Sequence, residues 1–478
     1  MFAFKERVYF KDFMFVGKNN QQASFDSQFF GPAFAIPEND PYLLIERKIE
    51  WDELLDKLKK NYSYEGKQSI PVKNLVLLLL FKHYNACSDV EIVELLAGSL
   101  PMQKALNITF MEAQIKSRKE FYFKKSKKKE IKIKGYINPS TLSKFRSKIG
   151  LEGVEMITQA CDKFLPKKKT RTAIADTTVS PSNIAYPTDI NLLEKARTVV
   201  LRNLQELSTE YGLKFRTYSR KARRTFLNYI KLGKKKRKES RKVQGKMIRF
   251  LARNLKQLKQ AYEIALEKAK SKDLFNFANE IIVPKEIKTI ETILEQQKEL
   301  HKLTPRSGNK TGIHIKDRIV SIFKPHVRAM SRGKIPNPTE FGAKILLEMR
   351  NGFLTLLKVT FNNESDQKII QGFFSRWKGL NVGTDRGMSS RENEKLAKEH
   401  GVKNFYAERK GKKSLEKTNG VKRIRKVRPA IEAKIGLAKR KFGLGRNLYK
   451  RGEEGESQWL HLCITAMNLR LFIRKAQL

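Results

Sequence analysis

The sequence has few cysteines, and they form no cluster. Its three cysteines, Cys87, Cys161 and Cys463, stand far apart in a chain of 478 residues. An odd number at such spacing argues against a disulfide framework and against a zinc knuckle, and it suits a reducing compartment. The six histidines are equally scattered, so no His/Cys cluster competes for a metal ion.

Long hydrophobic runs are also missing. The longest uninterrupted apolar run covers residues 75–81, which is far too short to span a bilayer. The N-terminal residues carry no apolar stretch of the kind found in a signal peptide. We therefore expect a soluble, cytoplasmic protein.

Acidic residues are scarce relative to basic ones. Against 49 Asp plus Glu stand 99 Lys plus Arg, giving a formal net charge of +50, while 40% of the chain is hydrophobic. The length predicts about two to four folded domains. A charge excess of this size favours a polyanionic partner. Nucleic acid is preferred over an anionic membrane surface, because the basic residues are spread over segments that have the pattern of folded structure.

The N-terminal third is predicted to be helical after an irregular, aromatic-rich arm at residues 1–40. Helices are expected at 45–62, from Pro71, and after Ser88, where Glu91 completes a capping box. A further short helix at 138–148 presents three side chains on its exposed face, namely Thr141, Lys144 and Lys148. Residues 41–165 thus resemble a helix-turn-helix-like DNA-binding domain, and a small helical bundle with a basic surface is the alternative.

Residues 166–478 are predicted to form an α/β domain with a large helical insertion at about 190–305. A basic linker leads into a β-prone segment that reaches Asp176. The insertion is rich in Lys and Arg and includes the basic run 234–238. Either it forms a helical hairpin laid along DNA phosphates, or it is a pair of solvated helices.

After the insertion, strand and helix signals alternate, which predicts one sheet with helices on its faces. Asn351-Gly352 between β-prone runs is a strong hairpin signal. The expected strands lie at 317–323, 339–347, 352–361, 380–385 and 402–406, and the expected helices at 365–377, at 390–400 and from Pro429.

Three acids are candidates for one catalytic site. Asp176 and Asp385 stand where predicted strands end, and Glu432 lies on the helix that begins at Pro429. Ligands in α/β sheets collect at the carboxyl ends of strands, and carboxylate oxygens suit Mg²⁺ or Mn²⁺. Arg428 and Lys439 share a helical face with Glu432, so a surface ladder of ion pairs is the alternative interpretation.

Several phrases of the sequence, in this order, resemble a DDE transposase of the IS5 insertion-sequence family. They are A-I-A-D-T-T at 173–178, Y-P-T-D at 186–189, K-D-R-I at 316–319, R-G-K at 332–334, E-F-G-A-K at 340–344, T-D-R-G at 384–387, R-P-A-I-E at 428–432 and K-R-K-F-G-L at 439–444. The resemblance spans about residues 40–475. Its N-terminal part, with S-I-P at 69–71 and S-T-L-S-K-F-R at 140–146, is similar to the helical domain of that family.

The resemblance implies an RNase H-like core in which Asp176, Asp385 and Glu432 hold two Mg²⁺ ions. The family signature Y-x2-R-x3-E-x6-K is met at Arg428, Glu432 and Lys439, whereas Arg425 stands where tyrosine is expected. Arg428 and Lys439 would then hold phosphates of the transposon end. The implied function is metal-dependent cleavage and strand transfer at terminal inverted repeats by a homodimer on double-stranded DNA, in the bacterial cytoplasm and associated with the nucleoid.

Two other functions stay open at this stage. One is a metal-dependent nuclease of the same fold, and the other is a catalytically inactive DNA-binding protein.

The sequence also predicts structural roles for two further acids. Glu340 is expected to be a surface residue of a strand, with a supporting role near the metal site as the alternative, and Asp189 is expected to cap a helix.

Overall fold

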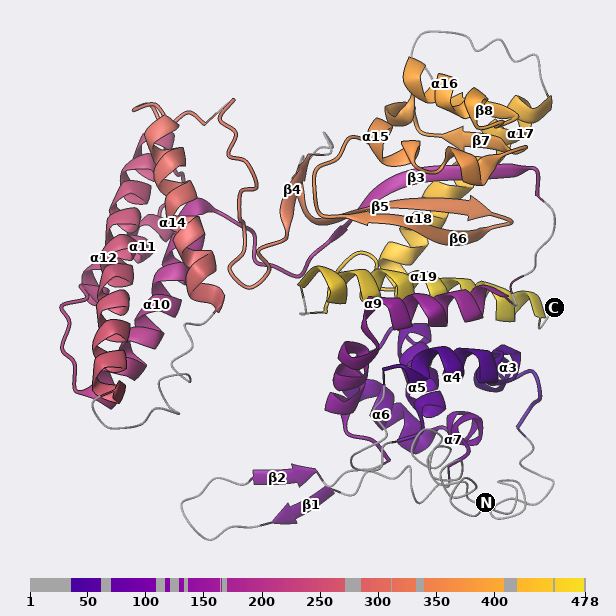
Figure 1. The fold of residues 1–478 in the computed structure, drawn as a ribbon, viewed down its shortest axis with the longest axis horizontal. Coiled ribbons are helices and arrows are strands. Elements are labelled where there is room, and N and C mark those ends of the chain that lie inside the picture. Colours follow the sequence, from indigo (N-terminus) through magenta and orange to yellow (C-terminus); the bar gives the residue numbers. More distant parts are fainter. Residues whose placement is uncertain are drawn as a thin grey trace. The chain divides into compact units, whose positions relative to one another are not determined.

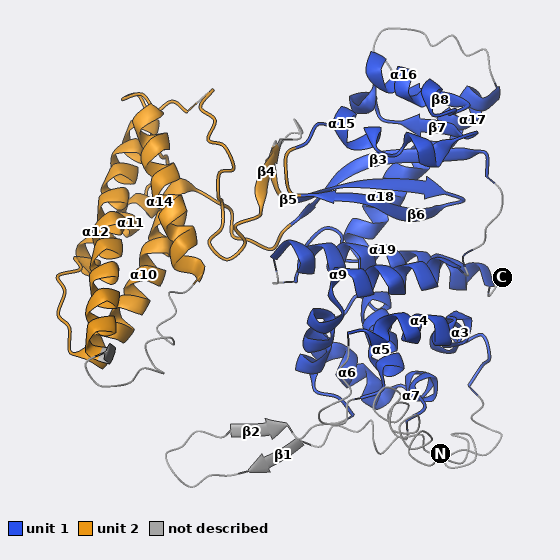
Figure 2. Cartoon of the chain, in the orientation of Figure 1, with its two compact units in different colours: residues 1–181, 343–360, 364–478 blue, residues 182–342, 361–363 orange. Residues whose placement is uncertain are grey.

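The computed structural model describes residues 36–61, 70–108, 117–120, 129–132, 136–163, 165, 170–270, 285–310, 312–331, 339–407, 419–449 and 452–476. The chain forms two compact units (Figure 2). Unit 1 comprises Met1–Pro181, Ala343–Thr360 and Glu364–Leu478, and unit 2 comprises Ser182–Gly342 and Phe361–Asn363. Most of the predicted N-terminal arm, up to residue 35, lies outside the described residues.

A mixed sheet forms the centre of unit 1 (Figure 1). Its strands are β3 (Thr172–Pro181), β5 (Thr339–Arg350), β6 (Phe353–Thr360), β7 (Asn381–Thr384) and β8 (Asn404–Ala407). The order is β6-β5-β3-β7-β8, with β3, β7 and β8 parallel and β5 antiparallel to β6. In unit 2, β4 (Arg328–Ser331) pairs antiparallel with the first residues of β5.

The β5–β6 hairpin forms where the sequence predicts it. Arg350 pairs with Phe353 across a two-residue turn. Asn351 and Gly352 have φ angles of 53° and 84°, the left-handed values that a tight hairpin turn of this twist requires. Glycine and asparagine tolerate these angles best, so the local sequence sets the register of the hairpin.

Helices cover both faces of the sheet. On one face, α15 (Asp366–Gln371), the short helix η2 (Phe374–Trp377) and α16 (Arg391–Glu399) belong to the layer whose buried core includes Ala175, Val382 and Trp377. On the other face, α17 (Asn419–Val427) and α18 (Pro429–Lys441) contact β3. A Cβ atom at Gly383 would lie only 2.4 Å from Cγ2 of Ile424, so a glycine there lets α17 approach β7 closely.

The N-terminal helices of unit 1 join the sheet through the long helix α19 (Gly452–Ala476), which contacts α5, α9 and β6. They are α3 (Pro41–Lys48), α4 (Trp51–Lys59), α5 (Val72–Tyr84), α6 (Asp89–Gly98), α7 (Leu100–Leu106) and α9 (Pro139–Lys163). Two short strands, β1 (Ser117–Glu120) and β2 (Lys129–Lys132), pair antiparallel. The capping box of Ser88 and Glu91 is confirmed at the start of α6.

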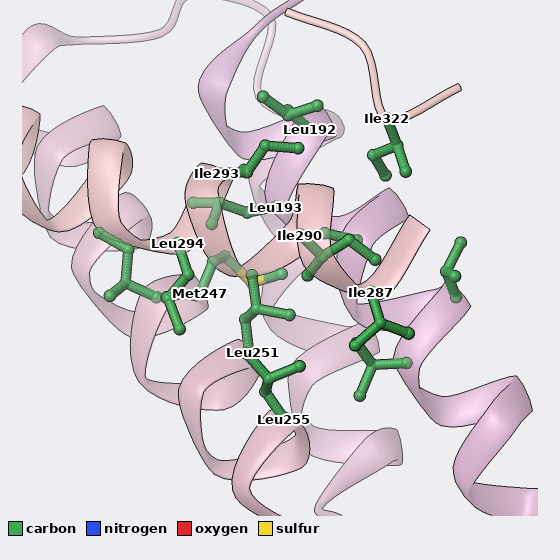
Figure 3. Close-up of a cluster of buried hydrophobic side chains, with 14 of the residues drawn as sticks. Leu192, Leu193, Met247, Leu251, Leu255, Ile287, Ile290, Ile293, Leu294 and Ile322 are labelled. Carbon is green, nitrogen blue, oxygen red and sulfur yellow. The ribbon is translucent and has the colours of Figure 1, made fainter. Parts of the chain in front are cut away.

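Unit 2 is built on a bundle of α10 (Asp189–Tyr211), α11 (Ser219–Ile230), α12 (Arg237–Lys270) and α14 (Lys285–Leu303). Its buried core includes Leu193, Leu251 and Ile290 (Figure 3). The helical insertion expected at about 190–305 is therefore divided, within the described residues, into these four helices. Gly212, with a φ of 67°, ends α10 in a left-handed cap.

Two secondary-structure predictions were wrong. The strand expected at 317–323 is absent, because Ile319 and Ile322 pack into the core of the helical bundle and Asp317 adopts a φ of 50°. The helix expected at 45–62 is interrupted at Ile49, whose extended backbone ends α3 while its side chain stays buried. Across the described segments, none of the helices has the combination of length and apolar character that a bilayer-spanning helix needs.

Truncating Leu251 tests the bundle core. Leu251 is fully buried on α12, whereas Leu303 at the end of α14 is 51% exposed. Leu251→Ala should lower the free energy of unfolding of unit 2 by about 2–5 kcal/mol, because it leaves a cavity, and Leu303→Ala should cost less than about 1 kcal/mol. Urea denaturation followed by circular dichroism measures both, and equal costs would contradict this packing.

Candidate active site

Asp176 and Asp385 are neighbours at the carboxyl ends of two parallel strand segments. Ala175 of β3 pairs with Thr384 of β7, and each aspartate is the next residue along the chain. Along β7, Gly383 faces one side of the sheet, and Val382 and Thr384 face the other. Because strand side chains alternate between faces, Asp176 shares its face with Ile174, which lies toward Ile424 of α17.

The first turn of α18 brings a cation and a third acid to the same place. Pro429 occupies the first turn of the helix, where its missing N–H costs nothing. A terminal guanidinium nitrogen of Arg428 lies 2.8 Å from a carboxylate oxygen of Asp385 and 3.6 Å from one of Glu432. α18 also contacts β3 directly. Arg428 thus connects the acid at the end of β7 with the acid on the helix.

Asp176 is the least exposed of the three acids, and the other two affect its pKa. Burial raises its pKa to about 6, and the nearby carboxylates of Asp385 and Glu432 also raise it. The backbone N–H of Thr177 and the charge of Arg428 act in the opposite direction. The field of all three charged neighbours therefore reaches Asp176, although Arg428 does not cancel the negative charge around it.

The other two acids face the solvent. The side chain of Asp385 is 53% exposed and that of Glu432 is 63% exposed. One oxygen of Asp385 also accepts a hydrogen bond of 2.7 Å from the backbone N–H of Arg386, which fixes the carboxylate at the start of the short helix η3 (Arg386–Met388). The site thus has one sheltered carboxylate and two that are open to an incoming ligand.

The donor set suits a hard divalent cation, but the three carboxylates do not surround one common point. Among the described residues, no group of three or more His, Cys, Asp or Glu side chains is placed to hold a metal ion. The three acids offer only carboxylate oxygens, the ligands that Mg²⁺ and Mn²⁺ prefer. Arg428 partly balances their charges, so a cation would take over the role that the guanidinium plays between Asp385 and Glu432.

The remaining signature residues lie on α17 and α18. Lys439 is half-buried on α18, about two helical turns after Glu432. Arg425, at the position where tyrosine was expected, lies on α17 and donates from Nε to the hydroxyl oxygen of Tyr406 on β8 at 2.9 Å. Tyr406 was not predicted as a functional residue. Its contact with Arg425 joins distant segments and left no local signal in the sequence.

A second polar network, also missed, lies beside β3 and involves α15. The hydroxyl of Thr177 donates to Asp366 at 2.9 Å, and the ammonium of Lys344 on β5 lies 2.6 Å from the same carboxylate oxygen. Because Thr177 and Asp176 are successive residues of a strand, their side chains point to opposite faces. The network ties β3 to β5 and α15 immediately behind the acid site.

The predicted DNA-binding residues of the N-terminal helices lie on one segment of α9. Lys144 and Lys148 are exposed and stand four residues apart, and Thr141 is half-buried. The segment ends at Gly150, whose φ of 64° breaks the helix. Residues four apart lie on one helical face, so the two lysines form a basic strip.

The prediction for Asp189 was wrong in part. Thr188 caps α10 by accepting a hydrogen bond from the backbone N–H of Asn191, and Asp189 is the first helical residue. Its carboxylate instead pairs with Lys310 at 2.5 Å and with Arg318. Glu340 lies on β5 opposite Met330 of β4 and is half-buried.

Replacing Asp176 by asparagine should change the pH dependence of stability. The folded protein keeps the Asp176 proton up to about pH 6, whereas the unfolded chain releases it near 3.8. Stability is therefore lost as the pH rises from about 4 to about 6. Asp176→Asn removes that loss and should stabilise the protein at pH 7.5 by roughly 1–3 kcal/mol.

Urea denaturation at several pH values measures this effect. Asp52→Asn, which changes an exposed acid of α4, is the control and should leave the profile unchanged. If Asp176→Asn and Asp52→Asn gave the same profile as the parent, the sheltered, charge-crowded position of Asp176 would be contradicted.

Comparison with known proteins gives a match in the N-terminal region. Residues 33–122 match the family model described as Transposase domain (DUF772). The search of the curated proteins and the search of the solved structures each found no match. The matched region contains α3 to α7 and ends before α9 and the acid site. This match over 90 of the 478 residues indicates a transposase domain in the N-terminal region.

Proposed function

We propose that the protein is a DDE transposase of the IS5 family, with an RNase H-like core that cleaves and joins DNA using two Mg²⁺ or Mn²⁺ ions. The observation that carries the proposal is the grouping of Asp176, Asp385, Glu432 and Arg428 at the carboxyl ends of β3 and β7. The transposase domain at 33–122 comes from a separate part of the chain. Two independent regions thus favour the same enzyme class.

The architecture of the sheet supports the RNase H-like assignment. The first acid lies on the central strand β3, and the second follows the neighbouring parallel strand β7. An antiparallel hairpin, β5–β6, completes the sheet on the other side of β3. The segment between β3 and β5 contains the helices of unit 2, which agrees with a helical insertion after the first strand.

Each acid has a distinct role in this proposal. Asp176 is sheltered and held by the sheet, so it would be the fixed ligand, while Asp385 and Glu432 are exposed and would complete the site. Bound divalent ions would activate the attacking oxygen and stabilise the leaving oxygen of a phosphodiester. If Asp385 and Glu432 held a cation, Arg428 would instead pair with a phosphate oxygen of the DNA.

Two displacements at the same site account for transposition. In the first, water attacks the phosphodiester at the transposon end and the 3′-hydroxyl leaves. In the second, that 3′-hydroxyl attacks a phosphodiester of target DNA and a target 3′-hydroxyl leaves. Both steps make one P–O bond and break another, so the same carboxylates serve both. Two ends must be joined in one event, which implies a homodimer on DNA.

DNA contact is assigned to two basic surfaces. One is the strip of Lys144 and Lys148 on α9, beside Thr141. The other is the exposed basic run 234–238 in unit 2, where the ammonium of Lys235 lies 5.5 Å from the ring centre of Tyr229. Exposed lysines that neutralise phosphates give affinity that depends on salt more than on sequence.

Cleavage of DNA that carries the ends flanking the gene tests the catalytic assignment. Replacing Asp176, Asp385 or Glu432 by alanine should reduce Mg²⁺-dependent cleavage about a hundredfold or more, because each removes a metal ligand. DNA binding should change less than about threefold, because the acids do not hold phosphates. Glu392→Ala, an exposed acid of α16, is the control and should cleave normally.

Joining of pre-cut ends to a target plasmid separates the related functions. A transposase joins them, whereas a nuclease of the same fold cleaves without joining. An inactive DNA-binding protein does neither. Full cleavage by Asp176→Ala, or DNA binding with no metal-dependent cleavage in the parent protein, would refute the proposed chemistry.

The basic strip on α9 is tested by the salt dependence of DNA affinity. The plot of log K against log salt has a negative slope. Lys144→Gln with Lys148→Gln should make that slope less steep by about 2, since each lost phosphate contact removes about 0.9. A matched pair on α16, Lys395→Gln with Lys398→Gln, removes the same charge from another exposed helix and should leave the slope nearly unchanged. Equal slopes for the two pairs would place the DNA elsewhere.

A further inference from the structure

A cavity of about 450 Å³ in unit 1 lies apart from the acid site. Its lining comes from α5, α6, α9, α19 and the segment before α19, and it includes Lys82, Asp89, Ser143, Arg146 and Tyr449. No function described above uses this cavity. Its walls join the helices of the matched transposase domain to the C-terminal part of unit 1.

Two buried cations and one acid line the cavity. The side chain of Lys82 is 4% exposed and that of Arg146 is 7% exposed. Both pair with Asp89: the Lys82 ammonium at 3.0 Å, and the Arg146 guanidinium through two hydrogen bonds of 2.9 and 2.7 Å. A single carboxylate thus serves two buried basic side chains, and among the described residues that line the cavity no second carboxylate pairs with them.

Glu91 adjoins the cavity, but it is exposed, and its carboxylate accepts a hydrogen bond of 2.6 Å from the backbone N–H of Ser88. The buried or half-buried titratable groups Tyr449, His83 and Cys87 supply no negative charge. The hydroxyl of Tyr449 bonds His83 at 2.9 Å and Lys82 at 3.2 Å, and burial raises the pKa of Tyr449 well above its usual value. Burial also lowers the pKa of His83 well below its usual value, and the charges of Lys82 and Arg146 lower it further. Burial raises the pKa of the Cys87 thiol to about 11.

Aromatic rings lie close to Lys82 and Arg146. The ammonium of Lys82 lies 4.6 Å from the ring centre of Tyr449, and the guanidinium carbon of Arg146 lies 4.2 Å from it. The indole of Trp459 lies 5.4 Å from the same ammonium. Ring faces attract cations but carry no net charge, so they fix the geometry without neutralising the site.

The cavity opens to solvent at a rim of small polar and apolar residues. Ser88 and Leu448 are exposed there, and Ser143 is partly exposed. The hydroxyl of Ser88 bonds Glu91 in the capping box, whereas the hydroxyl of Ser143 can donate to an acceptor that enters the cavity. Two buried basic side chains with the hydroxyl of Ser143 have the donor composition of an oxyanion site, and the cavity volume is ample for a phosphate group.

We propose that this cavity binds a tetrahedral phosphate oxyanion, held by Lys82 and Arg146 and by the hydroxyl of Ser143. The same chemistry can come from a phosphodiester of bound DNA or from free inorganic phosphate. Only the DNA source rests on the proposed function, since a free phosphate site would exist whatever reaction the acids catalyse. Buried unbalanced charge is costly, so occupation by an oxyanion should stabilise the fold.

Thermal unfolding of the full chain in inorganic phosphate, compared with sodium chloride at equal ionic strength, tests the site. Phosphate should raise the Tm of the parent protein in a saturable way. Ser143→Asp places a negative charge at the rim and leaves the buried pairs intact, so it should weaken phosphate binding about tenfold or more. Ser147→Asp, one turn further along α9 and exposed, adds the same charge outside the cavity lining and should keep the Tm rise.

Two buried variants sharpen this test. Lys82→Met should abolish the phosphate-dependent rise, and Asp89→Asn should enlarge it because the cavity then holds two unbalanced cations. No rise in phosphate beyond that in chloride would overturn the proposal, and so would an equal rise in Ser143→Asp and Ser147→Asp. Because the Ser143→Asp comparison leaves the ion pairs intact, it decides the matter even if Lys82→Met fails to fold.

DNA binding identifies the source of the phosphate. If the oxyanion belongs to DNA, Ser143→Asp weakens DNA affinity more than Ser147→Asp, and phosphate competes with DNA more strongly than chloride does. If it is free phosphate, the two variants bind DNA alike while only Ser143→Asp loses the Tm rise. Loss of cleavage in the acid-site variants with the Tm rise intact would show that this site is independent of the proposed reaction.

Discussion

The electrostatic balance at the carboxyl ends of β3 and β7 is the constraint on which the account of this protein depends. The carboxylates of Asp385 and Glu432 raise the pKa of Asp176 there, and the guanidinium of Arg428 contacts Asp385 and Glu432. Like charges at close range are unfavourable in a partly buried site, so a fold does not gather them for stability alone. The rest of unit 1 holds them there: the sheet fixes Asp176, the short helix after β7 fixes Asp385, and α18 presents Glu432.

The helix α19 extends this constraint to the N-terminal helices. It contacts α5 and α9 on one hand and β6 and α18 on the other. The side chain of Asn468 donates to and accepts from the backbone of Leu354 on β6, at 2.7 and 3.0 Å. A buried asparagine with both groups satisfied fixes the helix against the strand. The region that matches a transposase domain is thus tied to the sheet that carries the acids.

Local signals in the sequence predicted the elements that depend on local physics. The Asn351-Gly352 turn, the capping box at Ser88 and the start of α18 at Pro429 each follow from residue types within a few positions. Residues 317–323 misled the prediction, because β-prone residues pack equally well against a helical bundle. The Arg425–Tyr406 contact and the Asp366 network involve residues far apart in the chain, so pattern alone could not reveal them. The sequence did indicate which acids to consider, but their proximity required the fold.

Binding of Mn²⁺ to the protein, followed by electron paramagnetic resonance, tests the central claim most directly. If the three carboxylates form one metal site, replacing any one of Asp176, Asp385 and Glu432 by its amide should weaken Mn²⁺ binding, and replacing two should abolish it. Unchanged Mn²⁺ affinity and stoichiometry in all three single variants would contradict the account.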